Sequence, residues 1–287
     1  MKPFLHPRVP LPVQRCHLEL TGRLIPRPPG TRRGTLRLGR IPAAVVTPPV
    51  RADDRVVLHL HGGGYCAGSP QSDAALAVHL ASSLSTPCYL PAYRLAPEHP
   101  FPAAVDDAAD AYAALLAQGH RPEHVLLSGS SAGAALALAV ALRVRDSGRR
   151  PPAAVMALSP MADLTFSGPP GQYRVDDPVL PRRSLAYSAD LYCPPRLRGR
   201  PSASPALADL SGLPPLLVHC GTEEILHGDA VRLAERARHS GTRVIFRAFP
   251  GMWHVFHAFA SVSATAAAGL AALAHDVTTL LHGRRDG

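Results

Sequence analysis

Two hydrophobic patterns alternate along most of the chain. Compact apolar runs, typical of strands buried on both faces of a sheet, occur at Val56–Leu60, Cys88–Pro91, Val125–Leu127, Val155–Ser159, Leu216–His219 and Val244–Phe249. Helical patterns occur at Ser72–Ser83, Ala103–Leu116, Ala134–Val144, Asp229–His239 and Val255–Leu281. Because strands that alternate with helices form parallel sheets covered on both faces, the chain is predicted to have an α/β fold with a mostly parallel sheet.

Three segments depart from this alternation. Short apolar alternations between Gly34 and Val46 predict antiparallel strands ahead of the parallel ones. Residues 1 to about 30 are proline-rich and weakly patterned, which fits either a helical lid element or a loosely packed arm. The stretch from Met161 to Pro205 is rich in prolines and also holds tyrosines. A long irregular insertion between core strands is typical of a lid over a site.

Composition narrows the class of protein. With 287 residues, of which 46% are hydrophobic, the chain can form one large domain or one domain with a small cap. It has no run of about 18 apolar residues, and Met1–Leu20 has no apolar core of the kind found in a secretory signal. We therefore expect no membrane span and a cytoplasmic protein.

Charge and cysteine usage argue against a nucleic-acid-binding protein and against a fold held by zinc or disulfides. The net charge is +9, but Lys2 is the only lysine and the arginines are scattered rather than clustered, so we expect no nucleic-acid partner. The five cysteines lack C-x-x-C spacing, which indicates reduced thiols rather than a zinc site or a disulfide framework. Cys66 and Cys220 lie near the motifs described below, and we interpret them as core residues rather than nucleophiles.

One short motif carries the candidate nucleophile. Residues 129–133 read Gly-Ser-Ser-Ala-Gly between an apolar run and an Ala/Leu-rich helical pattern. This G-x-S-x-G pattern at a strand-to-helix turn is the nucleophile elbow of α/β-hydrolases. The small flanking residues let the chain pass through a strained turn that exposes the hydroxyl of Ser131 at the start of the helix. The pattern predicts Ser131 as a nucleophile.

A glycine-rich loop supplies the second motif. His61-Gly62-Gly63-Gly64-Tyr65 follows directly after the buried run at Val56–Leu60. Glycines let the backbone approach a substrate and leave N–H groups free to bind a developing oxyanion, as in the HGGG-type loop that accompanies the serine elbow. We therefore predict oxyanion donors in Gly62–Gly64 and interpret His61 as a residue that fixes the loop.

The serine needs a histidine base and an acid, which follow it in the order serine, acid, histidine. His254 is the best placed of the fifteen histidines, because it lies in the loop after the last predicted strand. Glu223 and Glu224 both follow the predicted strand at Leu216–His219, and spacing alone does not choose between them. Asp229 is interpreted as an acid in the first turn of a helix.

Together, four motifs resemble those of the bacterial hormone-sensitive-lipase family of esterases. They are His61–Tyr65, Tyr93-Arg94-Leu95-Ala96-Pro97-Glu98, the serine elbow and Gly251-Met252-Trp253-His254, and the resemblance runs from about Gly34 to the C-terminus. The resemblance implies the α/β-hydrolase fold, no cofactor and no metal. It favours Glu224 as the acid, and it adds the amide of Ala132 to the oxyanion donors at Gly62, Gly63 and Gly64.

The resemblance also implies the domain organisation. Residues 1–287 are expected to form a single α/β-hydrolase domain with a small helical cap made of about residues 1–30 and 162–206. Members of the family are often dimers, so a homodimer is an expectation by analogy. The chain departs from the family at Ser130, where the family usually has Asp, and at Ala134, where it usually has Gly. Contacts made by that Asp must be replaced.

These observations predict a serine carboxylic-ester hydrolase with Ser131, Glu224 and His254 as its triad. It would act through an acyl-enzyme on small-molecule substrates, either short-chain acyl esters or lactones. Two alternatives stay open: an amide or formamide hydrolase with the same residues, and a non-catalytic ligand-binding protein on the same scaffold.

Overall fold

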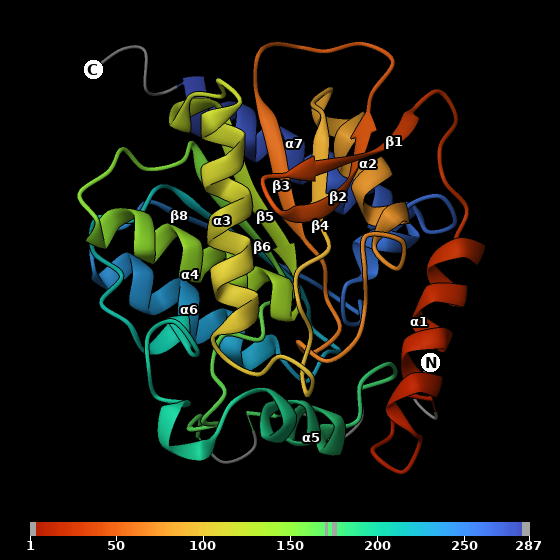
Figure 1. The fold of residues 1–287 in the computed structure, drawn as a ribbon, viewed down its shortest axis with the longest axis vertical. Coiled ribbons are helices and arrows are strands. Elements are labelled where there is room, and N and C mark those ends of the chain that lie inside the picture. Colours follow the sequence, from red (N-terminus) through yellow and green to blue (C-terminus); the bar gives the residue numbers. More distant parts are fainter. Residues whose placement is uncertain (1–3, 170–171, 174–176, 283–287) are drawn as a thin grey trace.

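The computed structural model describes residues 4–169, 172–173 and 177–282, and an eight-stranded sheet runs through its centre (Figure 1). The strand order is β1-β2-β4-β3-β5-β6-β7-β8. The strands are β1 (Arg32–Leu38), β2 (Ile41–Thr47), β3 (Val56–Leu60), β4 (Cys88–Pro91), β5 (Val125–Ser130), β6 (Ala154–Leu158), β7 (Leu216–Gly221) and β8 (Val244–Phe249). The pairs β1–β2 and β2–β4 are antiparallel, and the pairs β4–β3, β3–β5, β5–β6, β6–β7 and β7–β8 are parallel. The predicted mostly parallel sheet is confirmed.

Helices cover both faces of the sheet. They are α1 (Leu11–Leu24), α2 (Ala74–Leu84), α3 (Ala103–Ala117), α4 (Ala132–Asp146), α5 (Arg182–Tyr192), α6 (His227–His239) and α7 (Ala264–His282). Helices α3, α4 and α6 share one hydrophobic core with one face of the sheet, while α2 and α7 pack on the opposite face. Figure 1 shows α1 and α5 outside these two layers.

The most enclosed helix is α4, which follows β5 and packs against β3, β5, β6 and α3. All but three of its residues are buried, and most of these are Ala, Leu or Val. Alanines let the helix approach the sheet closely, and each buried Leu contributes roughly 1.5–3 kcal/mol of hydrophobic stabilisation. A helix held this firmly provides a rigid base for the residue at its N-terminus, Ser131.

One segment differs from the sequence-based expectation, and in another the structure shows one of two alternatives that the sequence left open. The last helix begins at Ala264 rather than at Val255, because Val255 has left-handed backbone angles (φ 52, ψ 38) and a 3-10 turn at Phe256–Phe259 follows. A left-handed residue ends regular helix geometry at that point. The N-terminal segment, for which a helical element and a loose arm were both open, contains the helix α1.

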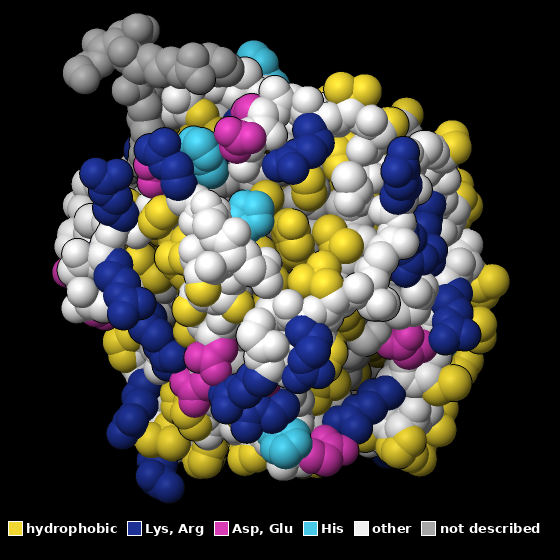
Figure 2. Space-filling view, turned by 45° about the horizontal axis from the view of Figure 1, so that its top comes forward, with side chains coloured by type: hydrophobic (Ala, Val, Ile, Leu, Met, Phe, Trp, Pro, Cys, Tyr) yellow, Lys and Arg dark blue, Asp and Glu magenta, His cyan; other side chains and the backbone are white. Residues whose placement is uncertain are grey.

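The surface carries its positive charge in a dispersed form. Figure 2 shows one face of the molecule, on which Lys and Arg side chains are interspersed with acidic and hydrophobic ones rather than gathered into one patch. Among the described residues, one helix window, Ala264–Leu281 in α7, is long and apolar enough to cross a membrane by length and composition. Of that window 39% is buried within the fold, where α7 packs against α2 and β7.

The turn between β5 and α4 packs so closely against β3 that it has no room for a side chain at Gly133. Gly133 lies in the first turn of α4, and a Cβ atom there would meet the backbone oxygen of Leu60 at 1.9 Å. Alanine is usually about 1 kcal/mol better than glycine inside a helix, but a clash with backbone cannot be relieved by a side-chain rotation. Gly133→Ala is therefore expected to lower the free energy of unfolding by at least about 2 kcal/mol in urea denaturation.

Gly199→Ala is the matched control, because nothing lies within 4 Å of a Cβ atom built there. Its free energy of unfolding should stay within about 0.5 kcal/mol of the parent. Equal stabilities for the two variants would contradict the close contact between the elbow and β3.

Candidate active site

The predicted nucleophile, Ser131, lies between the end of β5 and the start of α4. Its backbone has φ 53 and ψ −118, outside the regions that non-glycine residues usually adopt. Its N–H donates to the carbonyl of Leu158 at 2.9 Å, and its own carbonyl accepts from the N–H of Met161 at 3.1 Å. Contacts to β6 and the segment after it thus hold the strained residue, as the elbow motif predicts.

The glycine-rich segment Gly62–Gly64, called the oxyanion loop below, follows β3 and faces the elbow. Both Gly63 (φ 114) and Gly64 (φ 62) have positive φ values, which favour glycine. A Cβ atom on Gly63 would meet the carbonyl oxygen of Ala67 at 2.1 Å. In the described part of the chain, the N–H groups of Gly63 and Gly64 have no hydrogen-bond acceptor, so both are free to bind a ligand.

Gly62 was predicted to be an oxyanion donor, and the structure corrects this prediction. Its N–H donates to a carboxylate oxygen of Asp73 at 3.2 Å instead of pointing to a free site. The amide of Ala132 opens α4, and the first N–H groups of a helix have no carbonyl partner within the helix. The backbone donors available at this site are therefore those of Gly63, Gly64 and Ala132.

His61 has the structural surroundings expected of a residue that fixes the loop. Its ring stacks on Tyr93 with 4.1 Å between ring centroids, and its Nδ1 lies 2.8 Å from the carbonyl oxygen of Gly62. The hydroxyl of Tyr93 donates to the carbonyl of His61 at 2.7 Å. Complete burial is the main cause that lowers the pKa of His61 to about 4, so the ring is neutral at physiological pH.

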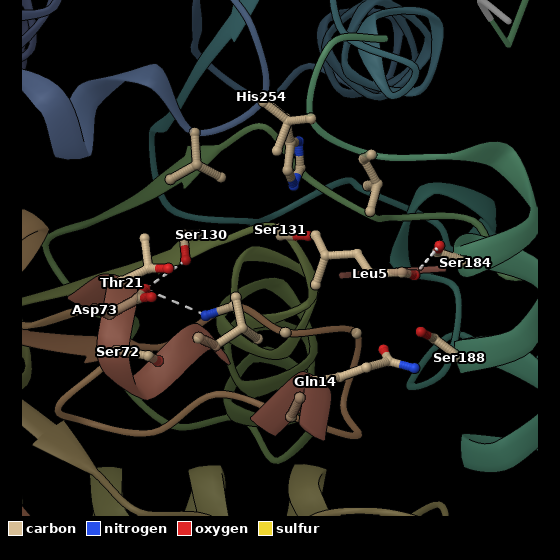
Figure 3. Close-up of a pocket in the computed structure, with 18 of the residues that line it drawn as sticks. Leu5, Gln14, Thr21, Ser72, Asp73, Ser130, Ser131, Ser184, Ser188 and His254 are labelled. Atoms are coloured by element: carbon tan, nitrogen blue, oxygen red, sulfur yellow. Dashed lines mark hydrogen bonds between the residues drawn. The ribbon is translucent and has the colours of Figure 1, made fainter. Parts of the chain in front are cut away.

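His254 and Glu224 meet in the loops that follow β8 and β7. The Nδ1 atom of His254 lies 3.7 Å from Oε2 of Glu224, a distance slightly too long for a hydrogen bond but short enough for a charged pair. Both side chains are buried. Figure 3 shows the imidazole of His254 pointing toward Ser131 across the cavity. The structure thus places the three predicted residues at one site.

Ser159 also belongs to this group, although sequence reasoning did not select it. Its hydroxyl donates to Oε2 of Glu224 at 2.6 Å, and the hydroxyl oxygen of Ser159 accepts the N–H of Val255 at 3.0 Å. One side chain therefore connects the acid to the residue that follows His254. The only signal in the sequence was its place at the end of a predicted strand, which does not reveal a partner 65 residues away.

The other two acids considered from the sequence lie differently. Glu223 is partly exposed, while its neighbour Glu224 is fully buried. Asp229 lies in the first turn of α6, as expected, and binds Gln172, Tyr173 and Arg232. Burial raises the pKa of Asp229 to about 6, and Arg232 opposes this effect. Glu224 is the acid that lies 3.7 Å from His254.

A cavity connects the elbow, the oxyanion loop and His254 (Figure 3). Much of its wall is apolar and comes from α1, from α5 and from the 3-10 turn before α7, together with residues that adjoin the two helices. The apolar lining residues include Leu11, Leu18, Ile25, Leu180, Leu185 and Phe259. Among the described lining residues, Asp73 is the only carboxylate, and there is no Lys or Arg. The hydroxyl of Ser130 donates to Asp73 at 2.6 Å, so the position where the family usually has Asp contacts a carboxylate from elsewhere.

Burial disfavours cysteine chemistry at this cavity. Cys66 lines the cavity, but burial raises the pKa of its thiol to about 12, so the reactive thiolate is scarce. All five cysteines are free thiols. No group of three or more His, Cys, Asp or Glu side chains in the described part of the chain is placed to hold a metal ion.

Comparison with known proteins supports the same class of enzyme. A family model for the alpha/beta hydrolase fold matches residues 57–258. The chain is 45% identical to an acetyl-hydrolase from Streptomyces hygroscopicus over 210 residues, which cover 73% of this chain and 70% of that protein. It is 35% identical to an esterase from Acinetobacter venetianus over 265 residues, which cover 92% of this chain and 87% of that protein.

Solved structures show that the likeness extends over nearly the whole fold. The crystal structure of an esterase from the bacterial hormone-sensitive lipase family has a TM-score of 0.90 and 32% identity, and the match covers 98% of this chain and 99% of that one. A hormone-sensitive lipase from a metagenome library has a TM-score of 0.90 and 35% identity, covering 95% and 94%. The chain is therefore a carboxylesterase-type hydrolase and belongs to the bacterial hormone-sensitive lipase family of α/β-hydrolases.

Proposed function

We propose that the enzyme hydrolyses esters through a covalent acyl-enzyme on Ser131. The hydroxyl oxygen attacks the ester carbonyl, and Nε2 of His254 takes its proton and passes it to the leaving alcohol. Glu224 orients the imidazole and stabilises its charged form. A water molecule, activated by the same imidazole, then releases the acid and restores the serine. The observation that carries this proposal is that Ser131 and His254 line one cavity, with Glu224 lying 3.7 Å from His254.

The oxyanion of each tetrahedral intermediate is proposed to bind the amides of Gly63, Gly64 and Ala132. These donors come from the oxyanion loop and from the N-terminus of α4, whose dipole also favours negative charge. Each such donor typically contributes about 3–4 kcal/mol to lowering the barrier. Because their backbone is held by the fold, little reorganisation is needed when charge develops.

The cavity favours uncharged substrates. Its wall offers apolar surface and a few hydroxyl groups, and no described Lys or Arg is present to pair with an anionic group. Asp73, the one carboxylate among the described lining residues, would repel a negative charge. We therefore propose neutral short-chain acyl esters or lactones as substrates.

We further propose that α1 and α5 form a cap over the cavity, within the segments 1–30 and 162–206. Residues of both helices line the cavity. The guanidinium of Arg15, on α1, donates to the carbonyl of Cys66 at 2.8 Å and to both carboxylate oxygens of Glu98 at 2.8 and 2.7 Å. These bonds attach α1 next to the oxyanion loop. The hydroxyl of Ser184, on α5, binds the carbonyl of Leu5, which joins the two parts of the cap.

An amide or formamide hydrolase remains an alternative, because the same triad cleaves both bonds. Comparing an ester with an amide and an N-formyl compound of the same acyl group distinguishes the two functions. Esterases and acetyl-hydrolases among the relatives favour the ester.

The nucleophile is tested by Ser131→Ala. Without the hydroxyl, the acyl-enzyme cannot form, so turnover of p-nitrophenyl acetate should fall by roughly 10⁴-fold or more. Labelling by a fluorophosphonate, followed by intact mass, should disappear in the same variant. Ser72→Ala is the control, because Ser72 also lines the cavity but lies outside the proposed triad. A Ser131→Ala enzyme with near-parent turnover would contradict the proposed mechanism.

The acid is tested by a matched pair of adjacent substitutions, Glu224→Gln and Glu223→Gln. Glu224 is buried beside His254, so loss of its charge should lower kcat by roughly 10²–10⁴-fold, as for other triad acids. Glu223 is partly exposed, and its substitution should change kcat less than about threefold. If Glu223→Gln lost more kcat than Glu224→Gln, the assignment of Glu224 as the triad acid would be wrong.

A further inference from the structure

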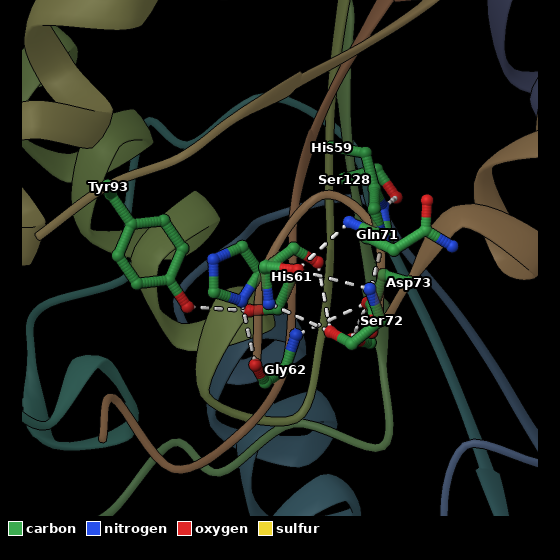
Figure 4. A network of polar contacts seen from close by, with 10 residues as sticks. His59, His61, Gly62, Gln71, Ser72, Asp73, Tyr93 and Ser128 are labelled. Carbon is green, nitrogen blue, oxygen red and sulfur yellow. Dashed lines mark hydrogen bonds and ion pairs between the residues drawn. The ribbon is translucent and has the colours of Figure 1, made fainter. Parts of the chain in front are cut away.

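A polar network lies directly behind the oxyanion loop and centres on Asp73 (Figure 4). Asp73 precedes α2, and its Oδ2 atom accepts the hydroxyl of Ser130 at 2.6 Å and the N–H of Gly62 at 3.2 Å. The same oxygen lies 3.2 Å from Nε2 of His59. One carboxylate oxygen therefore joins three chain segments: β3, the oxyanion loop and the elbow.

His59, on β3, fixes the orientation of that carboxylate. It is a fully buried residue of β3, and its Nδ1 lies 3.0 Å from the hydroxyl oxygen of Ser128 on the neighbouring strand β5. Because Nε2 faces a carboxylate, we assign the ring proton to Nε2, which leaves Nδ1 to accept the hydroxyl proton of Ser128. Burial alone would raise the pKa of Asp73, but the hydrogen bond from His59 and further polar contacts bring it below its ordinary value.

Two of the three residues that bind Asp73 directly precede residues of the proposed machinery. Gly62 precedes the donors Gly63 and Gly64, and Ser130 precedes Ser131. Glycines have no side chains with which to hold a conformation, and they lose more freedom on ordering than other residues. The loop and the elbow also touch, since a Cβ atom on Gly62 would lie 2.9 Å from Oγ of Ser130. A shared hydrogen-bond acceptor is therefore well placed to fix their spacing.

We propose that Asp73 is a positioning residue for ester hydrolysis, which holds the oxyanion loop at the correct distance from the nucleophile elbow. This inference rests on the proposed function. Asp73 takes the place of a carboxylate within the elbow itself, where this chain has Ser130. It acts through backbone geometry and transfers no proton to the substrate.

The inference predicts a specific kinetic pattern. Oxyanion donors bind the tetrahedral state much more strongly than the ground state, so loss of their placement lowers kcat and leaves KM nearly unchanged. Misplacement by about 1 Å costs on the order of 10²-fold in rate. A residue with a merely structural role would lower stability without this selective effect on the transition state.

The test is Asp73→Asn, which keeps the size of the side chain and removes its charge. Its kcat for p-nitrophenyl acetate should fall about 10–100-fold, with KM within about threefold of the parent. The inhibition constant of an alkyl trifluoromethyl ketone, which forms a tetrahedral adduct, should rise by a similar factor. The inhibition constant of the corresponding trifluoromethyl alcohol, which forms no adduct, should stay within about twofold.

Ser130→Ala is the second variant, and it removes one hydrogen bond while Asp73 keeps its contact with Gly62. It should lower kcat about 3–10-fold with the same selectivity for the ketone, and it keeps the inference testable if Asp73→Asn does not fold. Asp276→Asn is the matched control, since Asp276 is a buried carboxylate on α7 that binds Arg247 at 2.6 Å and does not line the cavity. Its kcat should stay within about threefold of the parent.

An unchanged kcat in Asp73→Asn, or a loss that appears only in KM, would overturn the inference. So would equal changes in the inhibition constants of the ketone and the alcohol. Fluorophosphonate labelling separates this failure from failure of the proposed function. If labelling depends on Ser131 and Asp73→Asn has parent rates, only the role of Asp73 is lost. If Ser131→Ala keeps its activity, the proposed function itself is wrong.

Discussion

The close approach of backbone to backbone at the turn between β5 and α4 is the constraint on which the site depends. A Cβ atom on Gly129 would clash with the backbone of Gly133, and a Cβ atom on Gly133 would clash with the end of β3. This contact forces Ser131 into a strained conformation and aims the N-terminus of α4 at the cavity. The proposed nucleophile and oxyanion donors are thus placed by the same packing that closes the hydrophobic core.

Polar groups around this turn are mostly buried and bind partners on other elements. Ser159 connects Glu224 to the loop that carries His254, and Asp73 connects the oxyanion loop to the elbow. Such contacts are stronger in a low-dielectric interior than in water, and a partner left unpaired there is costly. The cavity wall around them is largely apolar. This arrangement suits the proposed reaction, in which negative charge develops on the oxyanion of the tetrahedral intermediate.

Local patterns predicted the parts of this structure that local physics determines. Apolar runs revealed the strands of the sheet, and the glycines of the elbow and of Gly62–Gly64 indicated tight turns, because only small residues fit there. The partners of Asp73 and Ser159 could not be predicted, since Ser130 is 57 residues and Glu224 is 65 residues from its partner. Likewise, no pattern indicates that Val255 adopts a left-handed conformation, which tertiary contacts impose. The engagement of Gly62 by Asp73 is the same kind of long-range effect.

The central claim is that the acyl group is carried by one serine whose oxyanion faces three backbone amides. A crystal structure of the enzyme inactivated by an alkyl phosphonate tests it most directly, because the phosphonyl group mimics the tetrahedral intermediate. The account predicts a covalent bond from phosphorus to Oγ of Ser131, with the phosphonyl oxygen about 2.7–3.1 Å from the nitrogens of Gly63, Gly64 and Ala132. Attachment to any other residue, or an oxygen turned away from these amides, would contradict it.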